Sequence, residues 1–566
     1  MSMKHSEKRT GTSGLGLQIW FACAMIVPNA IIAAVLGFGL RQTVASLALP
    51  LGFYCIWGAL LPRSGIMILL ALPLMFLAAF QLVLLYLFED AVISSDMFAN
   101  LMTTSLPESS ELLGNIYPAL ACIVSVYLTL TGTAVYAAVR GKRLAEPVKR
   151  WSVLCGAMIM CTGAVAALSL RIGGDTDFRI TSDVFPCNVI YNHLLSRHQW
   201  AKVYDYDNTS SSFGFRAERD KRTEDREIYV LVVGESSRAF SWGAYGYGRN
   251  TTPRLDTTAG VCWFGSVLTQ SNATYKSVPL MLCCVNAGTY DFMYGTRGIA
   301  ELFSDAGFRT AAISNQPPDG AMIENLISQA DTTVHMDADG DMHADGDMLP
   351  VLERIVSDGE DDLFVILHMY GSHFNYRKRY PESFSHFQPD RFRRLGWDEA
   401  LCVVNAYDNS VLYTDYVLSR IIELLAGSGA CSALMYCSDH GEDLFDDSPS
   451  RFLHSSSHLS YYQLHVPCFC WMSDKYAECF GEKVSAARAN SGLLSSTSAV
   501  FHTVSDMAGI SSPYVSERFS LLSGGYDPST VKYYIDDTYK AVKYGDSGIN
   551  DDDMRIFINK GIGFSR

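Results

Sequence analysis

Basic residues are too few in this chain for a nucleic-acid-binding protein. Its 566 residues include 44 Lys and Arg against 59 Asp and Glu, which gives a formal net charge of −15 at pH 7. Binding to nucleic acid depends on a basic surface that neutralises phosphates, so this balance argues against nucleic acid as a partner. A chain of this length is expected to form two or more domains.

Charge of either sign is scarce before about residue 170. That part contains five segments that are long and apolar enough to span a bilayer: 16–38, 43–61, 65–88, 114–139 and 151–170. The first run is too long for a cleavable signal peptide, and four more follow it. The rest of the chain is polar and acidic. The sequence therefore predicts a helical membrane domain of five spans, residues 1–170, followed by a soluble domain.

The loop between the third and fourth predicted spans, residues 89–113, has no Lys or Arg and carries five acidic residues. By contrast, the N-terminal tail, the loop after the second span and the segment RGKRLAEPVKR at 140–150 are basic. Because basic loops tend to remain in the cytoplasm, the N-terminus is expected inside the cell. Residues 89–113 and everything after residue 170 are then expected outside.

This outer loop carries Asn100, Thr104 and Glu108 at four-residue spacing. If the segment is helical, the three side chains share one face. A solvated helix face is the plainer interpretation of such a triplet, and Pro107 weakens a continuous helix there.

Strands and helices are expected to alternate after Glu227. The predicted strands are 228–233, 310–314, 363–368 and 432–437, and the predicted helices are 298–305 and 405–425. This alternation is typical of a mostly parallel sheet covered by helices on both faces. Residues 171–226 are interpreted as a linker that lies along the membrane surface, and residues 227–566 as the catalytic domain.

Two of the predicted strands end in residues that can bind a metal. Gly234 and Glu235 follow the strand 228–233, and Asp439 and His440 follow the strand 432–437. Ligands of open α/β sheets bind beyond the carboxyl ends of the strands, so these side chains are expected at one rim. A mixed set of carboxylates and imidazole suits zinc or manganese better than calcium.

A calcium-binding loop is lacking. The acidic stretch DADGDMHADGD at 337–347 has neither the glycine nor the distal glutamate of such a loop at the required offsets, so it is predicted to be a solvated surface loop. Of the 15 cysteines, five lie in apolar segments and are expected to be structural. Some of the others could pair in an oxidising compartment.

Four histidines also follow predicted strand ends. His368 and His373 come after the strand 363–368, and His454 and His458 come after His440. A lone histidine is usually a structural hydrogen-bonding group. Four of them near acidic residues at strand ends favour metal or phosphate binding.

The segment SNATYKSVPLML supplies two candidate nucleophiles, Thr274 and Ser277, ahead of Pro279 and at the start of a predicted short helix. A hydroxyl beside a divalent cation can ionise near neutral pH, and a helix N-terminus stabilises a phosphoryl group.

Together these motifs resemble those of the membrane phosphoethanolamine transferases of Gram-negative bacteria. The matching patterns are N-x-x-x-T-x-x-x-E at 100–108, VVGESSR at 232–238, Thr five residues before the S-V-P proline, LH-x-x-GSH at 367–373, N-x-Y-D-N-S-V-L-Y-x-D at 405–415 and SDHGE at 438–442. The resemblance implies a five-span membrane domain followed by an α/β domain of the alkaline-phosphatase and sulfatase type, with a mostly parallel central sheet.

The resemblance also implies roles for individual residues. Zinc would be held by Glu235, Thr274, Asp439 and His440, with Thr274 as the nucleophile. One tightly bound zinc ion is expected, with a second as an alternative and manganese as the less expected metal. Substrate contacts are implied for His373, His454, His368, Asn100, Thr104, Glu108 and Asn315.

The implied reaction moves phosphoethanolamine from phosphatidylethanolamine to a glycolipid, with lipid A as the first expected acceptor. The implied protein is a monomer in the Gram-negative inner membrane, with its catalytic domain in the periplasm. Three features depart from the lipid A enzymes. Gln270 and Leu280 stand near the places of a cysteine pair, and a lysine is missing from the segment SNQPPDGAM. Extra residues after Asp439 make His458 a substitute for His454.

Other functions stay open from the sequence. A glycerol-phosphate transferase of the lipoteichoic acid synthase type shares the five spans, the threonine and the metal. Core sugar, glucan and protein-linked glycan are alternative acceptors for phosphoethanolamine. A sulfatase would need a Cys or Ser in a C/S-x-P-x-R motif, which is not evident at Thr274. A membrane sensor that keeps the fold without activity would not need all the metal-site residues.

Overall fold

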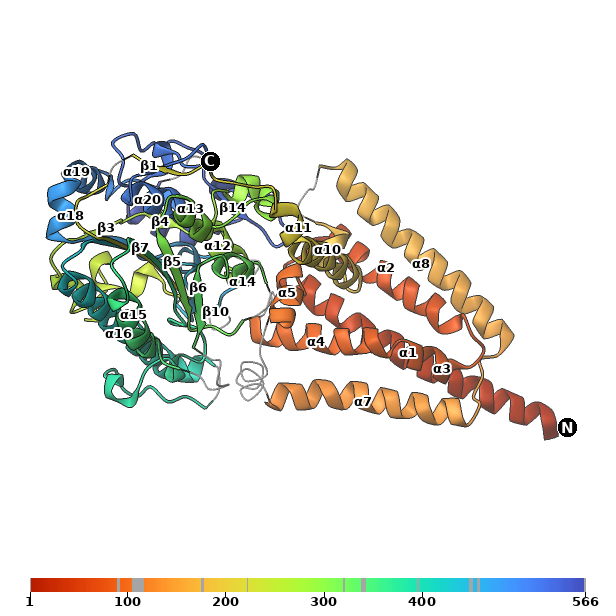
Figure 1. Ribbon diagram of the computed structural model, residues 1–566. Helices are drawn as coiled ribbons and strands as arrows, with labels where there is room; N and C mark the ends of the chain where they lie inside the picture. The colour runs from red at the N-terminus through yellow and green to blue at the C-terminus, as the bar shows by residue number, and fades with distance from the viewer. Residues whose placement is uncertain are drawn as a thin grey trace. The chain divides into compact units, whose positions relative to one another are not determined.

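The chain folds as two compact units (Figure 1). The first contains the described parts of residues 1–98 and 112–197, and the second those of 99–111 and 198–566. The computed structural model describes residues 2–88, 92–103, 117–174, 178–220, 222–318, 321–336, 343–393, 396–446, 451–455 and 459–563.

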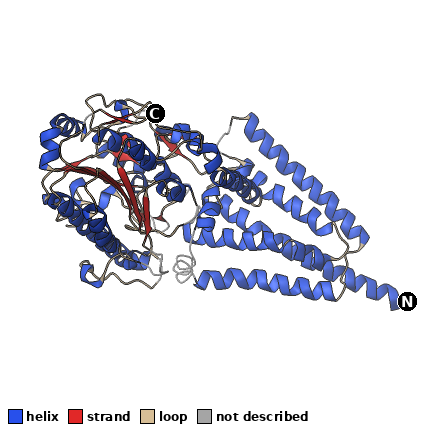
Figure 2. Cartoon of the chain, in the orientation of Figure 1, coloured by secondary structure: helices blue, strands red, loops and turns tan. Residues whose placement is uncertain are grey.

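The first unit is helical throughout its regular structure (Figure 2). Its described helices are α1 (Ser2–Val35), α2 (Leu40–Ala59), α3 (Ser64–Leu70), α4 (Leu72–Phe88), the first part of α5 (Ser95–Thr103), α7 (Tyr117–Val139), α8 (Glu146–Ile172), α9 (Ile180–Asp183) and the first part of α10 (Cys187–Tyr204). Helices α2 and α8 approach closely because glycines face each other. A Cβ added at Gly156 would lie 2.9 Å from the carbonyl oxygen of Gly52. Small residues at such contacts are typical of helices that associate in a membrane.

Helices are present at each of the five predicted spans, but the number of spans is not established. Among the described residues, Gly14–Val35 and Glu146–Ile172 are long and apolar enough to cross a membrane. Helices α3 and α4 would together make a third span, bent by 59° at a short break, and the apolar helix Ile123–Val139 is shorter. The five-span count and the orientation therefore stay predictions.

The second unit is built on a seven-stranded mixed sheet. The strand order is β3 (Val261–Trp263), β11 (Cys468–Met472), β8 (Cys431–Ser438), β2 (Glu227–Gly234), β7 (Leu363–His368), β5 (Arg309–Ser314) and β6 (Thr332–His335). Strand β11 runs antiparallel to both its neighbours, and the pairs from β8 to β6 are parallel. The predicted mostly parallel sheet is confirmed.

The central strand β2 is buried on both faces, which explains its continuous apolar sequence. Its alternate residues enter two different cores. Ile228, Val230 and Val232 pack in the core that includes residues of α15 (Met348–Ser357) and α16 (Ala400–Gly427). Tyr229, Leu231 and Val233 pack in the core of the other face.

That second face is covered by α12, α13 and α20 (Figure 1). The remaining helices of the unit are α11 (Tyr206–Ser210), α12 (Thr274–Leu282), α13 (Ile299–Asp305), α14 (Met322–Ile327), α17 (Tyr461–Leu464), α18 (Asp474–Cys479), α19 (Gly481–Asn490), α20 (Ala499–Met507) and α21 (Asp551–Asn559). The remaining strands are β1 (Glu218–Arg219), β4 (Val267–Leu268), β9 (Asp443–Leu444), β10 (Phe452–Leu453), β12 (Ser495–Ser496), β13 (Ile510–Ser511), β14 (Tyr533–Ile535) and β15 (Ala541–Lys543).

The division between the two units falls inside the predicted linker, after Arg197. Tyr206 and Phe215 are buried in the core of the second unit, and β1 pairs with β13. The segment from His198 onward therefore belongs to the fold of the second unit. Its position at a membrane surface stays a prediction.

The acidic stretch departs from expectation at Asp345, which is buried rather than solvated. Its carboxylate accepts hydrogen bonds from the backbone N–H groups of Tyr370 at 2.7 Å and Gly371 at 2.9 Å, and from Asn315 Nδ2 at 2.8 Å. The two backbone donors follow the end of β7, and a buried carboxylate that accepts from them and from an amide is stabilised by these charge-assisted hydrogen bonds. Residues 337–342 lie outside the described part of the chain. All the cysteines that the structure describes are free thiols.

Candidate active site

The two predicted metal-binding segments meet because their strands are neighbours. Strands β2 and β8 pair in parallel, with Gly234 opposite Ser438. The next residues, Glu235 and Asp439, therefore leave the sheet side by side, and both are fully buried. The backbone N–H of Ser236 donates to Asp439 Oδ1 at 3.1 Å and joins the two segments.

His440 completes this group, and its hydrogen bonds define its tautomer. Its Nδ1 lies 2.9 Å from the carbonyl oxygen of Gly441, which can only accept, so Nδ1 carries the proton. The Nε2 atom, which then carries a lone pair, lies 3.3 Å from Asp439 Oδ2 and 3.5 Å from Glu235 Oε1. An imidazole with a free Nε2 between two carboxylates is an arrangement that binds a metal.

The hydroxyl of Thr274 lies in the same group. Thr274 is the first residue of α12, and its Oγ1 lies 3.0 Å from His440 Nε2 and 3.2 Å from Glu235 Oε1. Ser277 lies one helical turn further along α12 and donates to Asp439 Oδ2 at 3.2 Å. The structure thus brings both candidate hydroxyls to the site, and Thr274 is the one in contact with His440.

The electrostatics of the group favour a cation. Burial raises the pKa of the Glu235 carboxyl, and the charge of Asp439 raises it further. Burial likewise raises the pKa of Asp439. A divalent cation would offset the repulsion between the two carboxylates. Two carboxylate oxygens, one imidazole nitrogen and one hydroxyl are a donor set that fits tetrahedral zinc, so the residues present suit the predicted metal.

A second group of possible ligands adjoins the first and consists of His440, Glu442 and His454. His454 Nδ1 lies 2.7 Å from Glu442 Oε2, and the ring centroids of His440 and His454 are 4.1 Å apart. Tyr376 donates its hydroxyl to Glu442 Oε1 at 2.6 Å. Burial raises the pKa of Glu442 to about 7 and lowers that of His454. Glu442 belongs to the SDHGE motif, but the sequence alone indicated no role for it.

His373 and His368 are the other two histidines that the sequence predicted for the site, and of the two His373 lies beside His454. The ring of His373 is 6.3 Å from that of His454, between centroids, and its Nδ1 lies 2.7 Å from the carbonyl oxygen of Phe374. His368 ends strand β7, is buried, and places Nδ1 3.4 Å from Ser314 Oγ. Burial lowers its pKa to about 4, so it is neutral near pH 7.

Asn315 contacts the segment around Asp345, because its Nδ2 donates to Asp345 Oδ1 and to the carbonyl oxygen of His343. Its neighbour Gln316 contacts the site directly and donates Nε2 to Glu235 Oε2 at 3.1 Å. The side chains of Asn100, Thr104, Glu108 and His458 lie outside the described part of the chain.

Gly371 is a further residue of the site that sequence reasoning missed. It has a φ of +51°, and a Cβ at this position would lie 2.6 Å from the carbonyl oxygen of Glu235. The next residue, Ser372, donates its N–H to that same oxygen at 2.9 Å. The backbone after β7 therefore supports Glu235 directly. The signal in the sequence was a glycine shortly after a strand end, within the GSH motif.

The N-x-Y-D-N motif of α16 supports the segment that follows Glu235. Tyr407 donates its hydroxyl to the carbonyl oxygen of Ser236 at 2.7 Å and accepts from the N–H of Arg238 at 2.9 Å. Arg238 is itself buried and pairs with Asp446 at 2.6 Å. These contacts explain why the two motifs occur together.

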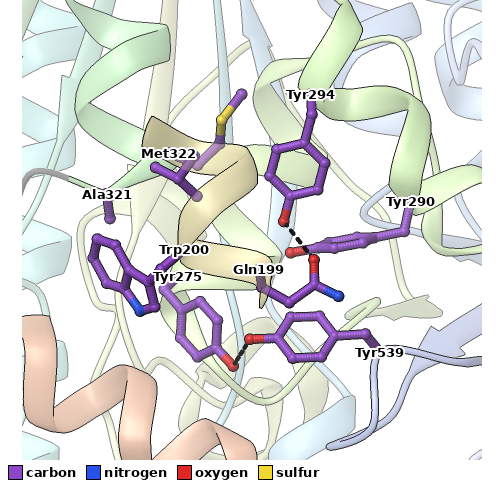
Figure 3. A pocket seen from close by; sticks show the side chains of 9 residues that line it. Gln199, Trp200, Tyr275, Tyr290, Tyr294, Ala321, Met322 and Tyr539 are labelled. Atoms are coloured by element: carbon purple, nitrogen blue, oxygen red, sulfur yellow. Dashed lines mark hydrogen bonds between the residues drawn. The ribbon is translucent and has the colours of Figure 1, made fainter. Parts of the chain in front are cut away.

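A small aromatic cavity lies beside the start of α12, because Tyr275, the residue after Thr274, lines it (Figure 3). Two hydrogen bonds cross its wall, from Tyr294 to Gln199 Oε1 at 3.4 Å and between the hydroxyls of Tyr275 and Tyr539 at 3.1 Å. The lining residues are Gln199, Trp200, Val203, Tyr275, Tyr290, Tyr294, Ala321, Met322 and Tyr539.

The strand order, the rim of acidic residues and the hydroxyl at the helix start define a class of protein. The chain belongs to the sulfatase family, whose sequence pattern matches residues 227–510. Its homologues include proteins named phosphoethanolamine transferases EptC, EptA and CptA.

Among these relatives is the Kdo(2)-lipid A phosphoethanolamine 7''-transferase of Escherichia coli K12, which is 25% identical over 425 residues, 69% of this chain and 73% of that protein. The chain spans about half the length of several other relatives that it matches: with EptC of Escherichia coli K12 the identity is 27% over 328 residues, 55% of this chain and 54% of that protein.

Solved structures share the fold. The integral membrane protein lipooligosaccharide phosphoethanolamine transferase A (EptA) from Neisseria meningitidis aligns with a TM-score of 0.71 at 20% identity, over 89% of this chain and 97% of that one. The C-terminal periplasmic domain of Escherichia coli EptC, solved in complex with Zn, aligns with a TM-score of 0.53 at 24% identity, over 60% of this chain and 99% of that domain. The chain thus has the EptA-like fold, with N-terminal apolar helices followed by a sulfatase-like domain.

Proposed function

We propose that this protein is a zinc-dependent phosphoethanolamine transferase of the Gram-negative inner membrane. It takes phosphoethanolamine from phosphatidylethanolamine onto Thr274 and passes it to lipid A. The observation that carries the proposal is the position of Thr274 Oγ1, 3.2 Å from Glu235 Oε1 and 3.0 Å from His440 Nε2. A hydroxyl held in a group of metal-binding side chains is the arrangement that an activated nucleophile requires.

The reaction is a double displacement. In the first half, Thr274 Oγ1 attacks the phosphorus of the donor, and the bond between phosphorus and the glycerol oxygen breaks, so that diacylglycerol leaves with a proton. In the second half, an oxygen of the acceptor attacks the phosphorus, the bond between phosphorus and Thr274 Oγ1 breaks, and the proton lost by the acceptor restores the threonine hydroxyl. Zinc, when bound, would lower the pKa of the threonine hydroxyl and polarise the phosphoryl oxygens.

The residues around the centre have separate tasks in this mechanism. Glu235, Asp439 and His440 would hold the zinc ion, and the Nδ1 bond of His440 keeps its Nε2 available for that task. His454, held by Glu442 at 2.7 Å, and His373 would bind the transferred phosphoryl group. Asn315, in the segment after β5, would contact the substrate. Its neighbour Gln316 donates a hydrogen bond to Glu235. His368 would have a peripheral role.

The outer-loop triplet of Asn100, Thr104 and Glu108 is proposed to bind the donor head group. A carboxylate is a natural partner for the ammonium of ethanolamine, and the amide and hydroxyl groups can hold phosphate or glycerol oxygens. The names of the relatives support phosphoethanolamine as the transferred group, and one of them names lipid A as its acceptor.

The test is transfer by the purified full chain in liposomes. Phosphatidylethanolamine and lipid A are supplied together, and mass spectrometry of the lipids is expected to show lipid A heavier by one phosphoethanolamine. Parallel reactions replace the donor with phosphatidylglycerol and the acceptor with a glucan or an oligosaccharide core. Addition of glycerol phosphate in place of phosphoethanolamine would instead identify a glycerol-phosphate transferase.

Replacing Glu235 with Gln is expected to lower zinc affinity by about a hundredfold or more, because a ligand charge is removed from a buried site. The measurement is zinc content by elemental analysis together with titration of the metal-free full chain. Glu301→Gln, which changes a partly exposed residue of α13, is the matched control and should leave zinc binding unchanged. Purified active protein without a transition metal would contradict the proposal.

The orientation in the membrane is tested by reporter fusions. An alkaline phosphatase reporter, which is active only outside the cytoplasm, is expected to work when fused after residue 180 and to fail when fused at residue 145, within the basic loop. A reporter that works only in the cytoplasm should give the opposite pattern at the same two positions. Alkaline phosphatase activity at residue 145 and none after residue 180 would rule out the predicted orientation.

A further inference from the structure

The C-terminal part of the chain, beyond the residues matched by the sulfatase family, lies against the loop that carries the candidate nucleophile. The strands β14 and β15 pair in antiparallel fashion and form a hairpin. The hairpin and the residue after it, positions 533–544, contact the segment 269–276, which we call the nucleophile loop. The contacts fall on both sides of Thr274.

Two of these contacts hold the backbone at the start of the nucleophile loop. The hydroxyl of Tyr544, which is buried, donates to the carbonyl oxygen of Thr269 at 2.6 Å. The backbone N–H of Ile535 donates to the carbonyl oxygen of Gln270 at 2.8 Å. The backbone at the start of the loop is therefore held by one backbone and one side-chain hydrogen bond from this segment.

A third contact reaches Asn272, two residues before Thr274. Tyr534 donates its hydroxyl to Asn272 Oδ1 at 2.6 Å. The amide of the same asparagine donates to Gln463 Oε1 at 2.6 Å, and its backbone carbonyl accepts the N–H of Ser455 at 3.1 Å. Asn272 thus joins the hairpin to the segments near His454, and its orientation depends on the Tyr534 hydroxyl.

The residues that follow Thr274 are held by the turn between β14 and β15. Lys276 is fully buried, donates Nζ to the carbonyl oxygen of Asp536 at 2.8 Å, and lies 4.4 Å from the ring centre of Tyr539. The hydroxyls of Tyr275 and Tyr539 meet at 3.1 Å, as Figure 3 shows. The C-terminal segment 533–544 therefore contacts residues on both sides of Thr274 in the sequence.

Helix α21 makes a similar contact with the segment around His454. Asp553 is buried, pairs with Arg451 at 2.7 Å, and accepts the backbone N–H of Tyr461 at 2.9 Å. Residues on both sides of His454 are thus attached to the same C-terminal segment.

We propose that the β14–β15 hairpin is a positioning element of the catalytic site, and that Tyr534 and Tyr544 are positioning residues for Thr274. The inference rests on the proposed function, since it takes Thr274 as the nucleophile. The hydroxyls of both tyrosines donate to residues of the nucleophile loop, Asn272 and Thr269, so both act through the loop. A nucleophile displaced by about 1 Å can lose up to about a hundredfold in rate, which makes such support consequential.

The experiment compares full-length Tyr534→Phe and Tyr544→Phe with the wild type. Each substitution removes one hydroxyl and keeps the buried ring. Release of diacylglycerol from fluorescent phosphatidylethanolamine, with lipid A present as the acceptor in mixed detergent micelles, is expected to show kcat about 10- to 100-fold lower. KM and zinc content should stay within about twofold, because Glu235, Asp439 and His440, the carboxylate and imidazole ligands proposed for zinc, follow β2 and β8 and lie outside the nucleophile loop. Hydrogen exchange in peptides covering 269–276 is expected to be faster than in the wild type.

Tyr526→Phe is the matched control. Tyr526 also donates its hydroxyl to a backbone carbonyl, that of Leu494 at 2.7 Å, but it lies outside the hairpin. Its kcat and the exchange of the nucleophile loop should equal those of the wild type. A purely structural role for Tyr534 and Tyr544 would lower the melting temperature while kcat per folded molecule stays at the control value.

The outcomes separate this inference from the proposed function. Unchanged exchange at 269–276 in both variants overturns the inference, whatever the activity. Faster exchange with kcat equal to that of the control overturns it as well, because the loop would then be held without consequence for the reaction. A wild type that releases no diacylglycerol overturns the proposed function instead, and the exchange measurement then decides alone whether the hairpin holds the loop.

Discussion

Thr274→Ala is expected to reduce phosphoethanolamine transfer by about a thousandfold or more, to the limit of detection. The substitution removes the hydroxyl that lies 3.0 Å from His440 Nε2, while the two carboxylates and the imidazole remain. Zinc content and the unfolding transition should therefore stay close to those of the wild type. The measurement is transfer to lipid A in liposomes by mass spectrometry, with Thr289→Ala as a control at an exposed position.

The covalent intermediate gives an independent check of this result. Wild-type protein supplied with the donor but without an acceptor is expected to gain one phosphoethanolamine on the peptide that contains Thr274. Fragmentation of that peptide distinguishes Thr274 from Ser277, whose hydroxyl is bonded to Asp439 at 3.2 Å. An adduct on Ser277 would show that Ser277, one helical turn after Thr274, is the nucleophile and would contradict the assignment to Thr274.

Gly371→Ala is expected to disable the site from a position that holds no metal or substrate. Its Cβ would lie 2.6 Å from the carbonyl oxygen and 3.2 Å from the Cβ of Glu235, and a φ of +51° is unfavourable for alanine. The nearest atoms are backbone atoms of Glu235, which cannot move aside as the end of a flexible side chain can, so Glu235 must shift. Zinc affinity and transfer should both fall by about a hundredfold, and the free energy of unfolding by about 1–3 kcal/mol.

The matched control for this substitution is Gly295→Ala, since a Cβ at Gly295 would meet nothing within 4 Å. Zinc titration, transfer assays and denaturant unfolding are measured on both variants. If Gly371→Ala binds zinc as tightly as Gly295→Ala does, the backbone after β7 does not support Glu235 in the way described.

The sequence predicted the centre of the fold well because local signals were strong there. The apolar run before Gly234 and the run before Asp439 each end in a loop with chemically distinctive residues, and both are strands of one parallel sheet. Strand β7 was predicted to the residue, Leu363–His368. Helix α16 begins five residues before the predicted 405, at Ala400, and helix ends are the part of a helix that local patterns define least.

Other features of the fold and site depend on contacts between segments that are distant in the sequence, and no local sequence pattern predicts them. Asp345 looked like a surface residue, and its burial follows from backbone donors at Tyr370 and Gly371 that only the folded sheet brings near it. Gln316 contacts Glu235 across 81 positions of sequence. The short strands β3, β6 and β11 were not predicted, because three to five residues carry too little periodicity to be recognised.

The adjacency of β2 and β8 has a consequence for how proteins of this kind can diversify. A sheet fixes Glu235 and Asp439 in place, so a bound ion meets ligands that are already ordered and little conformational entropy is lost on binding. The hydroxyl of Thr274, the proposed nucleophile, comes by contrast from the first residue of helix α12, outside that sheet. Mutations in and around the segment 269–276 can therefore alter rate or acceptor choice during evolution while the proposed ion site stays constant. Selection can then act on the two parts of the site separately.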